Sequence, residues 1–302
     1  MNLKAFHSSK ILPGLLGLLL WAGVAQGLGF EEGGRYDPSR HNRFLAGTFP
    51  QAPVPNSTFI LAAYEDQLRG AGWQTSRPKK KVALISPQHF LTANHLRATE
   101  SITFLDASGT LQTFAVTKVT RISGDIAIGT LEIPVPEELG IRPFPVASVH
   151  GGGPEGRGIF YVGNSPSGPV AFCVGRTGFD KSYNGIANLD SELVANKNFR
   201  DRVIGVTGDS GSPSFFISEG ELLLLGHHYT PRQDFVLGFQ AAAVNAHLAA
   251  SGYTLELRDA PEGCGDGAVE GAAAALAFVG WRQIRKGKRC DPKKANNTES
   301  RC

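Results

Sequence analysis

The sequence predicts an all-β protein built from antiparallel strands, and three observations lead to this fold class. Short runs of β-branched and aromatic residues alternate with turn-forming residues through most of the chain. Helix-like spacing of apolar residues is hard to find before about residue 235. The 37 Gly and 18 Pro among 302 residues favour many short elements joined by turns. These patterns indicate an antiparallel sandwich or barrel, and not a parallel sheet alternating with helices.

The sequence divides into four segments. Residues 1–27 read as a signal peptide, and residues 28–57 as an irregular amino-terminal segment. Residues 58–258 form the expected folded domain, and residues 259–302 a linker with a basic tail. The expected strands are residues 57–64, 81–87, 89–94, 101–106, 113–122, 125–133, 158–164, 169–175, 213–217, 221–229 and 235–240. One helix is expected over 241–252, with Gly252 as its stop.

The amino-terminal segment has the layout of a secretory signal. Lys4 and Lys10 form a basic start, residues 11–24 are apolar, and Ala25 and Gly27 suit a small-residue cleavage site. The apolar run is shorter than a membrane span, which needs about 20 residues. The alternative is an amino-terminal core helix, although the run has no polar face. We therefore expect a secreted, periplasmic or cell-surface protein.

The carboxyl-terminal tail combines an apolar stretch with a strongly basic end. Ala268–Trp281 is apolar, and from Arg282 onward eight Lys or Arg residues stand against two acidic ones. The stretch reads either as a weak membrane anchor or sorting signal, or as an exposed or packed tail helix. Glu270 and its short length count against an anchor. Membrane contact is expected, if anywhere, through this tail alone.

Charge and cysteine content restrict the function class. The net charge of +3 is carried by the tail and the signal, so the folded body is mildly acidic. A basic nucleic-acid-binding face is therefore not expected. Three of the four cysteines lie in the last forty residues, and Cys173 is expected as a buried small hydrophobe.

Three segments carry residues with catalytic chemistry. "GVTGDSGSPSFF" presents Ser210 among turn-forming residues, "LISPQHFLTANHL" contains His95, and "ISGDIAIGTLEI" places Asp125 before an alternating apolar strand. A serine hydroxyl is a weak nucleophile until an oriented base takes its proton, and a carboxylate that accepts an imidazole N–H supplies that orientation. Alone, His95 reads equally as a core or loop histidine, and Asp125 as a strand-start cap. His89 is expected on the surface.

The order His95, Asp125, Ser210 resembles that of the chymotrypsin-like serine peptidases. "LTANH" is similar to that family's "LTAAH", "DIAIGTLEI" to "DIALLKL", and "GDSGSPSF" to "GDSGGP". The resemblance covers Thr58 to Leu255. It implies two antiparallel six-stranded β-barrels with a carboxyl-terminal helix and an active site between the barrels. It further implies an exported serine endopeptidase that cleaves protein or peptide substrates with no metal and no organic cofactor.

The resemblance also assigns a role to each residue. Ser210 would attack the scissile carbonyl, His95 would take and return the proton, and Asp125 would orient the imidazole. The backbone N–H groups of Gly208 and Ser210 would form the oxyanion hole. Leu96 replaces the cysteine that commonly follows the histidine, which points to an exported bacterial-type member.

Asp209 has two interpretations. In the activated branch of the family, the equivalent aspartate pairs with an amino terminus released by cleavage, and a cut after Arg43 would release Phe44. Alternatively, Asp209 is a structural residue that bonds local backbone donors.

The substrate pocket is assigned to Ile204, Thr207 and His228. Ile204 stands where the trypsin branch keeps an aspartate, so strict cleavage after Arg or Lys is not expected. His228 falls where the glutamyl-specific branch has a histidine that reads the substrate carboxylate. An acidic and a small or apolar preference therefore both stay open, as does the alternative that His227 and His228 are an exposed strand end and a wall residue.

Two other function classes are kept. The first is a catalytically inactive binding protein on the chymotrypsin fold. The second is a surface-anchored adhesion protein whose tail carries the function. The oligomeric state is not predicted.

Overall fold

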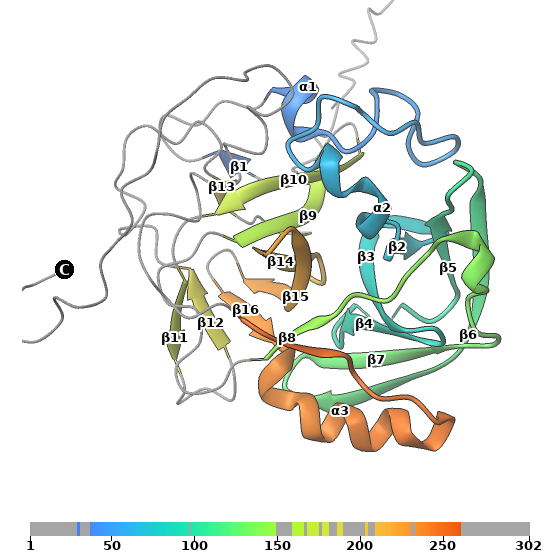
Figure 1. Ribbon diagram of the computed structural model, residues 1–302, viewed down its shortest axis with the longest axis vertical. Helices are drawn as coiled ribbons and strands as arrows, with labels where there is room; N and C mark the ends of the chain where they lie inside the picture. Colours follow the sequence, from blue (N-terminus) through green and yellow to red (C-terminus); the bar gives the residue numbers. More distant parts are fainter. Residues whose placement is uncertain are drawn as a thin grey trace, which may run out of the picture.

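The described chain folds into two lobes, shown by the computed structural model in Figure 1. The first lobe is a closed barrel and the second is a larger open sheet. The signal peptide expected at residues 1–27 and the tail from residue 261 onward lie outside the description. The structure describes residues 29–30, 37–96, 98–148, 159–165, 168–174, 177–180, 186–189, 203–204, 209–230 and 233–260.

Six antiparallel strands form the first lobe, in the closed order β2-β3-β4-β7-β6-β5. They are β2 (Ala71–Gln74), β3 (Arg77–Ser86), β4 (His89–Ala93), β5 (Ser101–Leu105), β6 (Leu111–Ser123) and β7 (Ile126–Leu131). The barrel follows from the alternation of side chains along a strand. On β3, Val82 and Leu84 join the apolar cluster to which every barrel strand except β2 contributes. Ala83 and Ile85 alternate with them and join the cluster shared with the second lobe.

The second lobe is a nine-stranded sheet that follows the path β10-β9-β14-β15-β16-β12-β11, with β8 and β17 beside it. Its strands are β8 (Val146–Ser148), β9 (Ile159–Ser165), β10 (Gly168–Val174), β11 (Thr177–Asp180), β12 (Ile186–Leu189), β14 (Pro213–Ser218), β15 (Glu221–Thr230), β16 (Gln233–Val236) and β17 (Leu257–Asp259). A separate pair joins β1 (Gly29–Phe30) to β13 (Val203–Ile204). The expected second six-stranded barrel is not confirmed, because the described pairings leave this sheet open.

Helices are short and mark the ends of strands. They are α1 (Pro38–His41), η1 (Ala62–Tyr64), α2 (Glu65–Leu68), η2 (Glu137–Leu139), η5 (Leu237–Gln240), α3 (Ala241–Leu248) and η6 (Ala249–Ser251). The predicted carboxyl-terminal helix is confirmed in α3, and Gly252 ends the segment in a left-handed conformation at φ 76°. In the part of the chain that the structure describes, no helix is long and apolar enough to cross a membrane.

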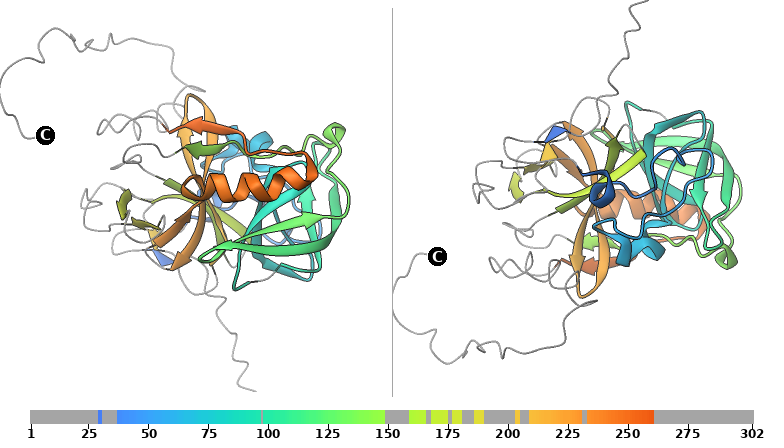
Figure 2. Two further views of the ribbon diagram at one scale, coloured as in Figure 1. Left: turned by 90° about the horizontal axis from the view of Figure 1, so that it is seen from below. Right: turned by 90° about the horizontal axis from the view of Figure 1, so that it is seen from above.

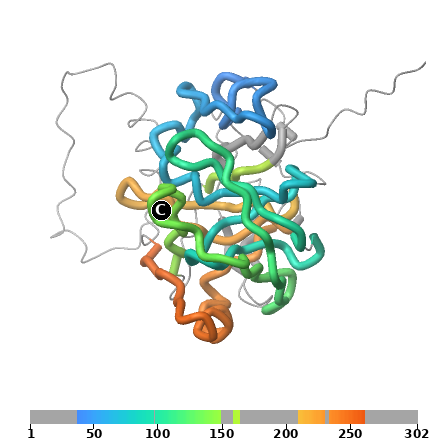
Figure 3. The backbone as a smooth tube through the Cα atoms, turned by 90° about the vertical axis from the view of Figure 1, so that its right-hand side faces the viewer, coloured from blue at the N-terminus to red at the C-terminus, as the bar shows by residue number. Residues whose placement is uncertain are grey.

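The helix α3 lies along both lobes, as the two views in Figure 2 show. Its buried residues Val244 and Leu248 join Ile126 and Ile128 of β7 and Leu222 of β15 in one apolar cluster. Burying a side chain of this size contributes about 1.5–3 kcal/mol. Seen from the barrel side in Figure 3, the segment after residue 37 lies at one end of the molecule and α3 at the other.

Two strand predictions were wrong. Residues 57–64 form turns and η1, because the N–H of Phe59 donates to Asn56 O and that of Ala62 to Phe59 O. Buried Phe59 and Leu61 alternate as they would on a strand, which explains the error. Residues 237–240 form η5 and not the end of a strand.

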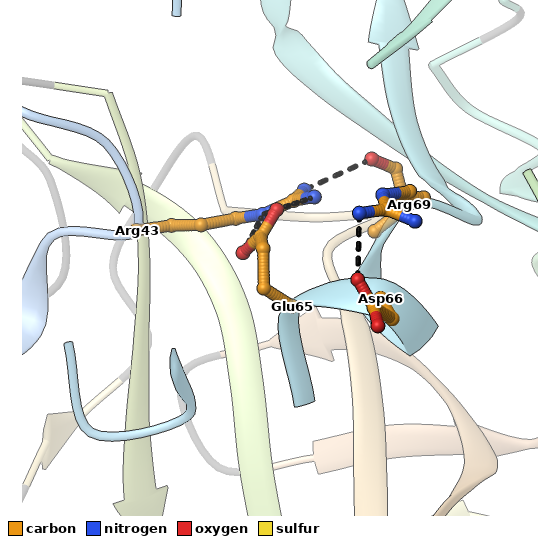
Figure 4. Close-up of polar contacts among 5 residues, drawn as sticks. Arg43, Glu65, Asp66 and Arg69 are labelled. Atoms are coloured by element: carbon orange, nitrogen blue, oxygen red, sulfur yellow. Dashed lines mark hydrogen bonds and ion pairs between the residues drawn. The ribbon is translucent and has the colours of Figure 1, made fainter. Parts of the chain in front are cut away.

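A buried ion pair ties the amino-terminal segment to the first lobe (Figure 4). Arg43 donates from Nε to Glu65 Oε2 at 3.0 Å and from Nη2 to Glu65 Oε1 at 2.7 Å, and its Nη1 reaches Ala71 O. Removing one partner of such a buried pair typically costs about 3–5 kcal/mol. Arg43 is 1% exposed, and its carbonyl accepts the N–H of Asn56. The bond after Arg43, the candidate activation cut, is therefore buried in this fold.

The expectation that His89 lies on the surface was wrong. His89 is 1% exposed, and its Nδ1 lies 2.8 Å from Ser86 Oγ. The rings of His247 on α3 and Tyr253 pack against it at 6.0 and 5.7 Å. Burial, followed by the charge of His247, lowers the pKa of His89 to about 4. The helix α3 therefore packs on the barrel against His89, an imidazole that is neutral near pH 7.

This histidine should make stability depend on pH. The pKa of His89 is lower in the folded state than its ordinary 6.5, so the unfolded chain binds more protons between pH 6.5 and 4. The free energy of unfolding should fall as the pH drops through this window, and His89→Gln should lessen that fall. Urea unfolding at pH 7.0 and 4.5 measures both. An equal fall in the variant would contradict this role.

Candidate active site

Neighbouring strands bring His95 and Asp125 together. Ala93, the last residue of β4, pairs with Ile126, the first residue of β7, so the residues beyond both lie at the same end of the barrel. His95 Nδ1 lies 2.7 Å from Asp125 Oδ2, and the backbone N–H of His95 donates to Oδ1 at 2.9 Å. The N–H of Asn94 donates to Asp125 O at 2.6 Å. Two contacts therefore fix the carboxylate against His95, and the third joins the backbones of the two segments.

This arrangement determines the chemistry of the imidazole. The Asp125 side chain is 9% exposed and that of His95 is 45% exposed. When Nδ1 donates its proton to the buried carboxylate, Nε2 keeps a lone pair and can act as a base. The same carboxylate stabilises the imidazolium that forms after proton uptake.

Ser210 lies in the turn that leads into β14. The N–H of Gly211 donates to His228 O at 2.8 Å, and that of Ser212 to Asp209 O at 2.9 Å. The Ser210 hydroxyl makes a long contact of 3.4 Å to Tyr229 O. Among the contacts of the described residues, none involves the Ser210 backbone N–H. The N–H groups of the two residues after Ser210 are thus paired, whereas that of Ser210 has no partner among the described residues.

Two glycines bring the lobes together at this site. Gly211 has φ +81°, and a Cβ there would lie 2.7 Å from Leu96 Cδ1 and 3.5 Å from Ala93 Cβ. Gly124 has φ +52°, and a Cβ there would lie 2.7 Å from Phe235 Cε1. The serine turn therefore packs on the segment that carries His95, and the turn before Asp125 packs on β16. Both positions favour glycine in conformation and in space.

A cavity of about 550 Å³ opens beside these residues. Both lobes contribute to its walls. They are lined by His95, Arg121, Gly124, Asp125, Tyr229 and Phe235. The hydroxyl of Ser210 reaches the carbonyl of Tyr229, so the serine lies next to this cavity.

His228, assigned to the substrate pocket, belongs to a buried polar cluster. Its Nδ1 lies 3.1 Å from Asp234 Oδ1, and Tyr161 donates its hydroxyl to the same oxygen at 2.7 Å. Burial first, and then the charge of Asp234, raise the pKa of Tyr161 well above its ordinary value, so its hydroxyl stays protonated. His227 is fully buried as well, so in the alternative that made this pair an exposed strand end and a wall residue, the exposed strand end was wrong.

The sequence analysis missed Asp234 and Tyr161. Asp234 pairs with His228 across the β15–β16 hairpin, and the short spacing between the two residues is the sequence signal for this pairing. Tyr161 comes from β9, far away in the sequence, and no local signal marks it.

Asp209 is buried, and a lysine lies within electrostatic reach of it. Lys81 is 2% exposed, donates from Nζ to Pro78 O, and has Nζ 5.2 Å from the Phe49 ring centroid. Burial lowers the pKa of Lys81 to about 7, and the charge of Asp209 opposes this shift. An internal cation therefore lies near the carboxylate that precedes Ser210.

Three remaining predicted site residues cannot be related to this geometry. Gly208 and Thr207 lie outside the described residues, and Ile204 is described only as part of β13. Within the described ranges, no group of three or more His, Cys, Asp or Glu side chains is arranged to hold a metal ion.

Comparison with known proteins assigns no family. No protein-family model and no curated protein matches the sequence. Among solved structures, the fold is similar to a mutant of human heparin binding protein (CAP37), with a TM-score of 0.46 and 14% sequence identity. The match covers 62% of this chain and 94% of that chain.

A glycine comparison tests the contact between the lobes. Gly124→Ala should cost more stability than Gly109→Ala, because both positions have positive φ but only Gly124 faces a neighbour, Phe235. The backbone penalty alone is about 1–2 kcal/mol, and the contact with the ring adds to it. Urea unfolding of both variants measures the difference. Equal losses would show that the turn before Asp125 is not pressed against β16.

Proposed function

We propose that the protein is an exported serine endopeptidase of the chymotrypsin-like kind, with Ser210 as nucleophile, His95 as base and Asp125 as orienting carboxylate. One observation carries the proposal. The His95 ring, fixed at Nδ1 by buried Asp125, is partly exposed beside the cavity that the Ser210 turn adjoins. A nucleophile, a base and an orienting group are the parts that acyl transfer needs.

The proposed reaction proceeds through an acyl-enzyme. Ser210 Oγ attacks the peptide carbonyl carbon while its proton passes to His95 Nε2, and Asp125 stabilises the imidazolium. His95 then gives this proton to the leaving amine as the C–N bond breaks. A water molecule, deprotonated by the same nitrogen, releases the acyl group and restores Ser210. The serine hydroxyl must first rotate away from Tyr229 O, which a long 3.4 Å contact hinders little.

The backbone N–H of Ser210 makes no hydrogen bond to the residues that the structure describes, which supports a role as oxyanion donor. The next two backbone N–H groups along the chain, those of Gly211 and Ser212, already donate to carbonyl oxygens. We propose Gly208 as the second donor. One such donor contributes about 3 kcal/mol to transition-state stabilisation.

For the substrate residue at the cleaved bond, we propose an acidic or a small or apolar side chain. His228 Nε2 is buried and without a hydrogen-bond partner among the described residues, which supports an acidic group. Ile204 argues against Lys and Arg. Export to the periplasm, cell surface or medium is proposed from the amino-terminal segment alone.

One contact favours a second candidate, a catalytically inactive binding protein on the same scaffold. The Ser210 hydroxyl donates to Tyr229 O, a backbone carbonyl that cannot take its proton. In this alternative, His95 and Asp125 form only a structural pair at the edge of the cavity.

Covalent labelling with a fluorophosphonate probe separates the two functions. Protein expressed from the full-length sequence should label at Ser210, as read by mass spectrometry of the modified peptide. Labelling should be absent in Ser210→Ala and slowed by roughly 10³–10⁴-fold in His95→Ala. Thr117→Ala, on an exposed part of β6, serves as the matched control and should label like the wild type. Folded wild-type protein that does not label would support the binding protein.

A further inference from the structure

The cavity beside His95 contains a cation that the proposed reaction does not use. Arg121 is an exposed residue of β6 that lines this cavity. Its Nε donates to Gly124 O at 3.0 Å, and in the described part of the chain this is the only hydrogen bond of its guanidinium. A guanidinium carries five N–H donors, and four of those of Arg121 make no hydrogen bond to the described residues.

The carboxylate of Asp125, at the same cavity, is directed at His95. Asp125 Oδ1 accepts the backbone N–H of His95, and Oδ2 faces His95 Nδ1. Asp125 keeps its charge, but its carboxylate is buried and both oxygens face His95, so Arg121 is the exposed charged side chain among the described lining residues. An anionic group that approaches the guanidinium directly would be attracted to it.

Part of the cavity wall is aromatic. Tyr229 and Phe235 of the second lobe pack with their ring centroids 4.8 Å apart at 65°. Tyr229 is 37% exposed, whereas Phe235 is 7% exposed and supports it from behind. This wall can pack against the methylene groups of a side chain while Arg121 binds its charged end. At about 550 Å³, the cavity has the size of a ligand pocket.

We propose that Arg121 and the Tyr229–Phe235 wall form a subsite that selects an acidic side chain of the peptide. His228, the member of the assigned pocket whose side chain the structure describes, does not line this cavity, and the subsite takes a residue near the cleaved bond on the His95 side. This inference rests on the proposed peptidase function for its substrate class. A glutamate fits the description best, because its methylenes reach along the aromatic wall.

Peptide binding to the Ser210→Ala variant tests the subsite without turnover. The probes are two fluorescein-labelled hexapeptides, Ala-Glu-Glu-Ala-Ala-Ala and Ala-Gln-Gln-Ala-Ala-Ala, and the readout is fluorescence anisotropy at low salt. The glutamate peptide should bind about tenfold more tightly, as expected for a charge-assisted hydrogen bond. Adding Arg121→Gln should lower the ratio of the two dissociation constants by several-fold, to whatever preference the His228 pocket supplies. Salt at 0.5 M should reduce the ratio by screening.

Two further variants separate charge from fold. Arg121→Lys keeps the cation and should keep most of the preference, even though it loses the Nε contact to Gly124. Arg142→Gln removes the same charge from an exposed residue outside this cavity and should leave the ratio unchanged. An absent preference, or one that Arg121→Gln does not reduce, would overturn the subsite.

Failure of the subsite and failure of the peptidase proposal give different results. A labelled Ser210 without acidic preference rejects the subsite alone. An acidic preference that depends on Arg121, in a protein whose Ser210 does not label, rejects the peptidase and leaves an anionic-peptide-binding cavity.

Discussion

The close approach of the two lobes at Gly124 and Gly211 is the constraint on which the candidate site depends. His95 and Asp125 come from the first lobe, and Ser210 comes from the second. The three proposed catalytic residues are therefore divided between the lobes. At both glycines a side chain of the opposite lobe lies 2.7 Å from where a Cβ would stand, so each lobe packs directly on a glycine of the other. The apolar cluster shared by β3, β4, β7 and the second sheet maintains this contact.

A second layer of buried polar groups supports the serine turn from behind. His228 bonds the turn through its backbone and Asp234 through its ring, and Tyr161 donates to the same carboxylate. Buried polar groups of this kind are costly unless they satisfy one another. These groups lie next to the turn that carries Ser210. Lys81 and Asp209 are a further pair of buried ionisable side chains near this turn, close enough for the charge of Asp209 to act on the pKa of Lys81.

Patterns within short stretches of the sequence predicted the elements that form from residues close together in the chain. Alternating apolar residues predicted most of the strands in both lobes, and the helical spacing with Gly252 predicted α3. The pairing of His95 with Asp125 was inferred from motif order, and the strand register between Ala93 and Ile126 explains why it forms. Long-range packing decided the rest. His89 becomes buried only because α3 returns to cover it, and residues 57–64 turn although their apolar pattern resembles a strand. Arg121 escaped notice because nothing local places its side chain beside His95.

The central claim is that His95 acts on Ser210 across the boundary between the lobes. A crystal structure of the protein after reaction with a fluorophosphonate tests it most directly. The account predicts a phosphonyl group on Ser210 Oγ, His95 Nε2 within about 3 Å of an oxygen of the adduct, and Nδ1 still bound to Asp125. An adduct on another residue, or a His95 ring turned away from a modified Ser210, would contradict it.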